Sequence, residues 1–257
     1  MTDTPARQML NKVPFVTLYF WIIKVLATTV GETGADFLNV RLGFGLNGTS
    51  VVMTGLLAVF LVIQMRSRRY VPWQYWIVVV LLSVVGTLLT DTLSDELGVS
   101  LYISTAAFAV ALTVTFVLWY RSEHTLSIHE IDSMRREGFY WAAILFTFAL
   151  GTAGGDLVSE KSGLGYLIAA LIFGGSILLI TIGFYARWLG AVLAFWLAYI
   201  LTRPLGASIG DLLTQTKANG GLGLGTMLIS GVFLVIIVSL VVYMTKSKVD
   251  DPREAQS

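Results

Sequence analysis

The chain has 257 residues, of which 56% are hydrophobic and 13% are charged, with a mean hydropathy of +0.77 and a formal net charge of +1. Soluble domains carry about 25% charged residues, so this composition excludes an ordinary soluble domain. Because the chain has no cysteine, it also excludes disulfide frameworks, thiolate metal sites and cysteine nucleophiles.

Eight apolar segments are each close to the length that a membrane-spanning helix needs, roughly 20 residues. In chain order they cover about 14–37, 49–65, 73–92, 100–120, 138–157, 164–186, 189–212 and 222–244. The first segment carries Lys24 and Glu32 and has no small-residue cleavage site behind it, so we expect a retained helix and not a signal peptide. The sequence therefore predicts an all-α, polytopic transmembrane bundle of about eight helices.

The positive charges outside these segments are distributed unequally between the two sides of the membrane. Three lie in the loops away from the termini: Arg41, Lys161 and Lys217. Twelve lie on the side of both termini: Arg7, Lys12, Arg66, Arg68, Arg69, Arg121, Arg135, Arg136, Arg187, Lys246, Lys248 and Arg253. Cytoplasmic loops carry an excess of lysine and arginine, so we expect a bacterial inner-membrane protein with both termini in the cytoplasm.

One motif occurs four times without a gap: an aromatic residue and tryptophan, nine residues, glycine, four residues, aspartate. The copies are Phe20-Trp21, Gly31, Asp36; Tyr75-Trp76, Gly86, Asp91; Tyr140-Trp141, Gly151, Asp156; and Phe195-Trp196, Gly206, Asp211. Each copy includes two predicted spans, so all four motif helices cross the membrane in the same direction. The pattern predicts four parallel two-helix repeats around an axis along the membrane normal.

The repeats divide the chain into two halves of the same design. We expect a first half over residues 1–123, a cytoplasmic linker over 124–137, a second half over 138–246 and a disordered tail over 247–257.

The segment Phe20-Trp-Ile-Ile-Lys24, which leads to Gly31-Glu-Thr-Gly-Ala-Asp36, resembles a bacterial "membrane-anchored protein" family built of repeats of unknown function. The resemblance covers nearly the whole chain. It implies an integral bacterial membrane protein with four repeats, and it implies no substrate.

Each motif position has a physical interpretation. The tryptophan is expected near the cytoplasmic interface, where its amphipathic ring is favoured. The aspartate lies 15 residues further on, about 22 Å along the helix. The glycine has two interpretations: close packing of helices, or a break in the backbone that exposes carbonyl groups to an ion.

Counting back from each aspartate in steps of four follows one helix face. One turn back are Glu32, Thr87, Thr152 and Ala207; two turns back are Thr28, Ser83, Phe148 and Arg203; three turns back are Lys24, Val79, Ile144 and Tyr199. Charged residues are costly in lipid, so we expect these faces to turn into the bundle. The candidate binding residues are Glu32, Asp36, Asp91, Asp156, Asp211, Thr28, Thr87 and Thr152, with Lys24 and Arg203 as coupling or charge-compensating residues.

Five carboxylates against two cations leave an excess of negative charge, which a bound cation or protonation would relieve. Carboxylate oxygens favour hard ions, so Glu32, Asp36, Asp91, Asp156 and Asp211 are also the candidate metal ligands. The leading hypothesis is a transporter of a small hard cation, either a divalent metal such as Mn²⁺ or Mg²⁺ or a monovalent ion, with protons as a second partner.

Two other hypotheses stay open, a passive cation channel and a non-transporting membrane scaffold that binds a partner protein. The chain has no catalytic triad or metalloprotease motif, so we expect no enzyme and no cofactor. Membrane lipid is an expected partner and nucleic acid is not; the sequence leaves the oligomeric state open.

Overall fold

The computed structural model describes residues 11–41 and 43–251, and this part of the chain forms eight α-helices and no strand. The helices are α1 (Leu18–Asp36), α2 (Gly45–Arg66), α3 (Pro72–Asp91), α4 (Leu101–Glu123), α5 (Met134–Asp156), α6 (Tyr166–Tyr185), α7 (Ala191–Thr214) and α8 (Thr226–Ser247). Short turns follow some of them: the π-helical η1 (Phe37–Arg41), η2 (Thr92–Glu96) and η4 (Leu157–Lys161), and the 3₁₀-helical η3 (Ile128–Glu130) and η5 (Lys217–Asn219). The predicted all-α class is confirmed.

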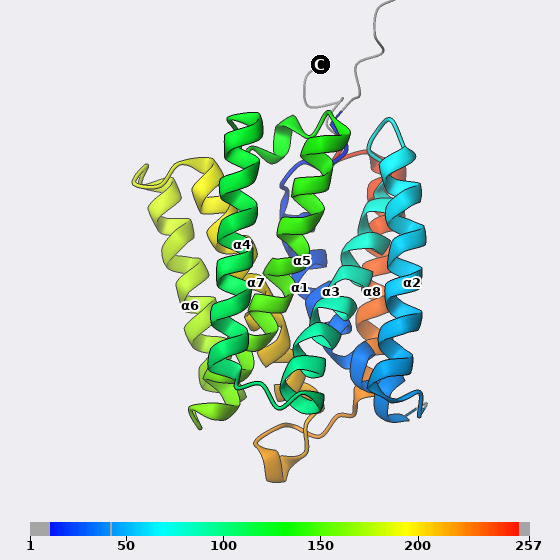
Figure 1. The fold of residues 1–257 in the computed structure, drawn as a ribbon, viewed down its shortest axis with the longest axis vertical. Helices are drawn as coiled ribbons and strands as arrows, with labels where there is room; N and C mark the ends of the chain where they lie inside the picture. Colours follow the sequence, from blue (N-terminus) through cyan, green and yellow to red (C-terminus); the bar gives the residue numbers. More distant parts are fainter. Residues whose placement is uncertain (1–10, 42, 252–257) are drawn as a thin grey trace, which may run out of the picture.

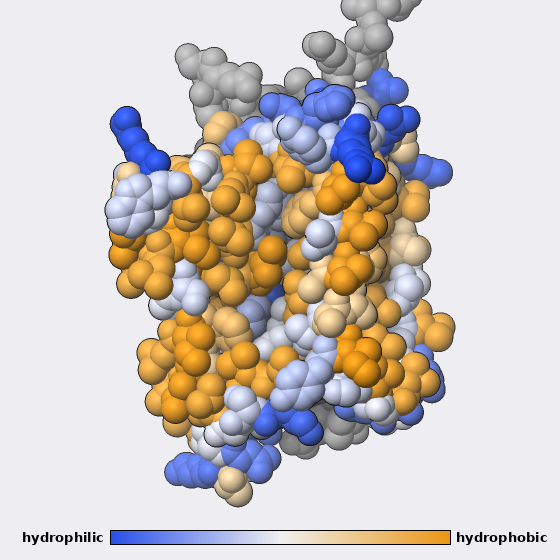
Figure 2. Space-filling view, turned by 60° about the vertical axis from the view of Figure 1, so that its left-hand side comes forward, coloured by the Kyte–Doolittle hydropathy of each residue, from blue (hydrophilic) through white to orange (hydrophobic). Residues whose placement is uncertain are grey.

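Seven of these helices, all except α1, are long and apolar enough to cross a membrane. The exception carries Lys24 and Glu32, and it packs against α3, α7 and α8. One face of the molecule shows the corresponding pattern: hydrophobic residues predominate between the two ends, on both sides of a more polar hollow, and hydrophilic residues gather at the two ends (Figure 2). The chain is therefore an integral membrane protein in which α1, with its charged residues, is held by three neighbouring helices.

The four motif helices form a closed ring, in the order α1, α3, α5, α7 and back to α1. The other four lie outside this ring, and each packs on the motif helix of the following repeat: α2 on α3, α4 on α5, α6 on α7, and α8 on α1 (Figure 1). The last contact closes the circle. The predicted parallel arrangement around one axis is therefore present, with each outer helix bridging two repeats.

The motif glycines mark the points where neighbouring motif helices approach most closely. A Cβ atom added at any of them would overlap the residue eight positions before the aspartate on the next motif helix: Gly31 on Ser83, Gly86 on Phe148, Gly151 on Arg203 and Gly206 on Thr28. All four glycines lie inside continuous helices. Of the two interpretations, close packing is therefore confirmed, and the helices have no backbone break at these residues.

The aromatic pairs repeat the same cyclic contact. The first aromatic residue of each motif touches the tryptophan of the next, with ring centroids 5.4–6.2 Å apart: Phe20 and Trp76, Tyr75 and Trp141, Tyr140 and Trp196, and Phe195 and Trp21. Trp76, Trp141 and Trp196 are buried. Ring packing between helices encloses these three tryptophans, and their position near the cytoplasmic interface stays a prediction.

Both ends of the described chain lie at one end of the bundle, called here the terminal end (Figure 1). The backbone N–H of Phe15 donates to the carbonyl of Asp250 at 3.0 Å, and the Tyr70 hydroxyl donates to Asp250 Oδ2 at 2.5 Å. Asp250 and Asp251 are buried. The tail expected to be disordered from residue 247 is thus packed on the bundle as far as Asp251, because these bonds hold it; residues 252–257 lie outside the described part.

Candidate functional site

Arg203 lies at the centre of the ring, fully buried, on the inward face of α7. Pro204 follows it inside the same helix. Proline has no N–H group, so α7 loses one backbone hydrogen bond directly beside the arginine and can bend there. Arg203 therefore lies on the motif helix that has a proline in its interior, and this helix can bend directly beside the guanidinium.

Oxygen atoms from the other three motif helices surround this guanidinium. Nη2 donates to Glu32 Oε2 at 2.6 Å and to Thr152 Oγ1 at 2.7 Å, and Nη1 donates to the Thr28 carbonyl at 2.6 Å. Further bonds go from Nη1 to Ser83 Oγ at 3.4 Å, from Nε to Thr152 Oγ1 at 3.1 Å and from Nη2 to Thr87 Oγ1. We call these five oxygen-bearing groups (the Thr28 carbonyl, Ser83, Glu32, Thr87 and Thr152) the oxygen cage.

The oxygen cage carries one formal negative charge, that of Glu32. Its carboxylate forms a salt bridge with Arg203, and the side chains are 12% and 0% exposed. In a low-dielectric interior such a pair is stable only when its remaining hydrogen-bonding groups are satisfied. The three hydroxyls and the carbonyl satisfy the guanidinium, so the cage and its arginine together are neutral.

Lys24 lies two turns before Glu32 on α1 and is fully buried. Its Nζ atom stands over the rings of Phe148 and Tyr199, 3.9 and 4.2 Å from their centroids. Aromatic faces attract cations, so this position suits the amine when it is protonated. Among the described residues, Lys24 Nζ has no hydrogen-bond partner. The centre of the ring therefore holds two basic groups and one carboxylate, not the carboxylate excess expected from the sequence.

The side chains of the ring are tightly closed at the level of Arg203 and in the next layer toward the terminal end. The layer of Lys24, Val79, Ile144 and Tyr199 and the layer of Thr28, Ser83, Phe148 and Arg203 are both 0% exposed throughout. Toward the opposite end, the side chains of Glu32, Asp91 and Asp156 are partly exposed. The structure is thus sealed from the terminal end and is less tightly closed toward the opposite end.

The motif aspartates lie one turn beyond the cage. Asp91 and Asp156 are half-buried and Asp211 is 9% exposed. Asp91 and Asp156 end their α-helices, and a π-helical turn begins at the next residue. The side chain of Asp36 lies outside the described residues. Within the described part, no three His, Cys, Asp or Glu residues gather as a metal group would; the metal role of Glu32, Asp36, Asp91, Asp156 and Asp211 stays a prediction.

The inward orientation expected for Lys24, Thr28, Thr87, Thr152 and Arg203 is confirmed, because all five are fully buried. The sequence could not show that Arg203 spans the axis and bonds to three other helices. Helical spacing gives the face of a residue, whereas its partners depend on how the repeats are arranged in space.

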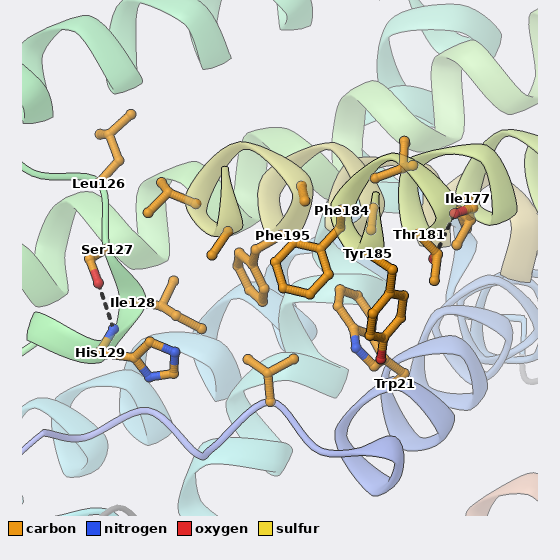
Figure 3. Close-up of a pocket in the computed structure, with 16 residues that line it drawn as sticks. Trp21, Leu126, Ser127, Ile128, His129, Ile177, Thr181, Phe184, Tyr185 and Phe195 are labelled. Atoms are coloured by element: carbon orange, nitrogen blue, oxygen red, sulfur yellow. Dashed lines mark hydrogen bonds between the residues drawn. The ribbon is translucent and has the colours of Figure 1, made fainter. Parts of the chain in front are cut away.

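A cavity of about 380 Å³ lies away from this centre, between the start of α1, the linker, the end of α6 and the start of α7. The rings of Trp21, Phe184 and Tyr185 gather at one side of it, and His129 lies at the other (Figure 3). Its lining is mostly apolar, and none of the predicted site residues contributes to it. An apolar cavity cannot compensate an ion, so the oxygen cage is the better candidate site for one.

The sequence also missed a buried ion pair at the terminal end. Lys12 Nζ donates to Glu137 Oε2 at 2.6 Å, with both side chains 1% exposed, and to the Met65 carbonyl at 2.9 Å. Gln64 and Trp141 donate to the other carboxylate oxygen, each at 3.4 Å. The sequence indicates only that Lys12 is one of the positive charges outside the predicted spans. It precedes the first predicted span, and no periodic pattern marks it as buried.

Comparison with known proteins gives one result. A family model described as "Repeat of Unknown Function (DUF347)" matches residues 19–70, 74–125, 139–187 and 194–250. No curated protein and no solved structure matches the chain. The four matched segments coincide with the four motif copies and with the helix pairs of the bundle. The protein is a member of the DUF347 repeat family and contains four of its repeats.

Proposed function

We propose that this protein transports a small hard cation across the bacterial inner membrane as a carrier, with protons as the coupling ion. The observation that carries the proposal is the oxygen cage, in which Arg203 occupies the position that a free cation would take. Carboxylate, hydroxyl and carbonyl oxygens are the ligands that hard cations prefer. When α7 bends at Pro204 and withdraws the guanidinium, the same oxygens become available to an ion.

Charge balance favours a monovalent cation over a divalent one. The cage has a formal charge of −1 and Arg203 has a charge of +1, so a monovalent ion can replace the guanidinium and keep the centre neutral. A divalent ion would leave a net positive charge in the low-dielectric interior beside Lys24. Uncompensated buried charge costs several kcal/mol. Mn²⁺ or Mg²⁺ would need a second carboxylate, for which the motif aspartates are the nearest candidates.

The sealed layers favour a carrier over a passive channel. The layer that contains Arg203 and the next layer toward the terminal end are completely buried, and in this structure the guanidinium fills the axis. A cation channel needs a continuous polar path, and a positive charge in that path raises the barrier to cations. Arg203 and a transported cation would instead alternate in one site.

The test is ion flux into liposomes that contain the purified full-length protein. Na⁺, K⁺, Mg²⁺ and Mn²⁺ are supplied one at a time, and we expect saturable uptake of a monovalent ion. Glu32→Gln should lower that uptake at least tenfold. The matched control is Glu130→Gln, a carboxylate that is 53% exposed in the linker, which should leave uptake unchanged.

Three outcomes oppose the proposal. Equal uptake by wild type and Glu32→Gln would refute the site. Single-channel currents in planar bilayers would show that the protein is a channel and not a carrier. The absence of flux for every ion, together with capture of one stoichiometric partner protein, would favour a scaffold.

The proposed orientation places the terminal end in the cytoplasm, as the positive-inside rule requires. The chain has no native cysteine, so single cysteines can be introduced without background. Ser122 lies exposed at the terminal end and Ser162 lies exposed at the opposite end. In intact cells, a membrane-impermeant thiol reagent should label Ser162→Cys and spare Ser122→Cys; the reverse pattern would invert the topology.

A further inference from the structure

Four buried tyrosines lie between the terminal end and the oxygen cage. Tyr70 precedes α3, and Tyr75, Tyr140 and Tyr199 lie on α3, α5 and α7. Their exposure is 5% for Tyr70 and 0% for the other three. Tyr75 and Tyr140 hold the same motif position, and Tyr199 lies one turn further along its motif, at the level of Lys24. The hydroxyl groups therefore progress from the surface toward the buried amine.

The contacts between them follow the same direction. At the terminal end, the Tyr70 hydroxyl bonds to Asp250 Oδ2, and its ring meets that of Tyr75 edge to face at 5.9 Å. The hydroxyls of Tyr75 and Tyr140 share a hydrogen bond of 2.5 Å in which either can donate. The ring of Trp196 contacts the rings of Tyr140 and Tyr199, with centroids 6.2 and 5.8 Å apart, and the Tyr199 ring lies 4.2 Å under Lys24 Nζ.

Packing alone does not account for these hydroxyls. The motif position of Tyr75 and Tyr140 is occupied by Phe20 and Phe195 in the other two repeats, so an aromatic ring without a hydroxyl suffices for the cyclic contact. Within the described residues the Tyr199 hydroxyl has no hydrogen-bond partner. A buried polar group left unbonded costs about 1–3 kcal/mol, so its retention points to a role other than stability.

We propose that Tyr70, Tyr75, Tyr140 and Tyr199 relay protons between Asp250 at the terminal end and Lys24 at the ring axis. The relay deepens the proposed function, on which it rests, by supplying the route of the coupling ion. Each hydroxyl gives its proton to the next group and takes one from the group before, so every tyrosine ends neutral. The Asp250 carboxyl becomes a carboxylate and the Lys24 amine becomes an ammonium. Hydroxyl rotation or a transient water molecule would span the steps from Tyr70 to Tyr75 and from Tyr140 through Tyr199 to Lys24.

The charged groups at the two ends suit this direction of transfer. Burial raises the pKa of the Asp250 carboxyl, as does the neighbouring Asp251, although the Tyr70 hydroxyl opposes them. A raised pKa lets a carboxyl hold a proton closer to neutral pH. At the inner end, the charged group beside Lys24 is Arg203, because Lys24 Nζ and the Arg203 guanidinium lie over the same Phe148 ring, 3.9 and 5.9 Å from its centroid. A proton delivered to Lys24 creates a second positive charge beside the guanidinium, and repulsion then favours the exit of Arg203 from the oxygen cage.

Tyr140→Phe is the test variant, because it removes one hydroxyl and keeps the ring. Liposomes with wild type or variant are assayed for cation exchange at equal pH on both sides, and for cation uptake driven by an imposed pH gradient. We expect exchange within twofold of wild type and a loss of at least tenfold in pH-driven uptake. Tyr102→Phe, on the exposed surface of α4, is the matched control and should change neither measurement.

The outcomes separate the relay from the transport proposal. Full pH-driven uptake by Tyr140→Phe would overturn the relay and leave cation transport intact. A parallel fall in both measurements would assign Tyr140 a structural role and also overturn the relay. Proton flux through the wild type that moves no cation, and that is lost in Tyr140→Phe, would support the relay and refute cation transport. A wild type that moves neither protons nor cations would refute both.

Discussion

Alanine at Gly206 should destabilise the protein, because this glycine closes the ring between α7 and α1. A Cβ atom there would overlap the Thr28 side chain and come within 2.9 Å of the Val25 carbonyl oxygen. Overpacking of this kind typically costs about 1–3 kcal/mol. It opposes the roughly 1 kcal/mol that alanine gains over glycine inside a helix. Because the contact includes backbone, which cannot rotate away, we expect the overpacking cost to lie at the upper end of its range and the net loss to be about 2 kcal/mol.

The control is Gly231→Ala on α8, where nothing lies within 4 Å of the added carbon. That variant should keep its stability or gain up to about 1 kcal/mol from helix propensity. Tryptophan fluorescence during SDS-induced unfolding in mixed micelles measures both. Gly86→Ala, whose new carbon would lie 2.6 Å from Phe148 Cβ and 3.1 Å from a backbone nitrogen, should behave like Gly206→Ala. If Gly206→Ala proved as stable as Gly231→Ala, the closed ring would be refuted.

Three more predictions concern the buried polar groups. Arg203→Met should cost about 3–5 kcal/mol by leaving the Glu32 carboxylate uncompensated, and adding Glu32→Gln should recover part of that loss in a double-mutant cycle. Glu137→Gln should lower the unfolding free energy by a similar mechanism, since it strands a buried lysine at the terminal end; the same SDS titration measures it. The raised pKa of Asp250 means that its contribution to stability is present below about pH 3.8, its ordinary pKa, and is lost as the pH rises through the folded value. Asp250→Asn should remove this decline in a series of unfolding measurements at increasing pH.

Each of these predictions has an opposing result. Additive effects of Arg203→Met and Glu32→Gln would mean that the two side chains do not interact. If Glu137→Gln left the unfolding free energy unchanged, Lys12 would have to be solvated and not buried in an ion pair with Glu137. A pH profile that keeps the same slope in Asp250→Asn would assign the decline to another group.

The repeated motif accounts for much of what the sequence could predict. Because glycine and aspartate recur at fixed distances from the tryptophan, the motif helices, their common direction and their inward faces follow from spacing alone. The segment that carries Lys24 and Glu32 could be placed inside the bundle on the cost of charge in lipid. Each of these inferences uses the sequence of a single helix and needs no knowledge of how the helices pack together.

The remaining features depend on relations between helices. The salt bridge of Arg203 with Glu32 joins the fourth repeat to the first, and nothing local to either residue indicates the other. The same holds for Lys12 and Glu137, which are far apart in the sequence and meet at the terminal end. The sequence sum of carboxylates and cations was misleading because it treated residues at two depths as one site. Glu32 lies with Arg203, and the motif aspartates lie a turn beyond.

Because α8 packs on α1 as each other outer helix packs on the next motif helix, the ring of repeats is closed, and the chain could begin at a different repeat without a change in helix packing. Phe15 and Asp250 already share a backbone hydrogen bond, so a short linker between the two ends of the described chain would not have to cross the membrane. A new start could then be opened between α4 and α5, in the former linker. Such a circular permutant would preserve every helix contact of the native bundle. By the same logic, four separate copies of a single repeat could assemble into this architecture as a cyclic tetramer, each lending its outer helix to the neighbouring subunit.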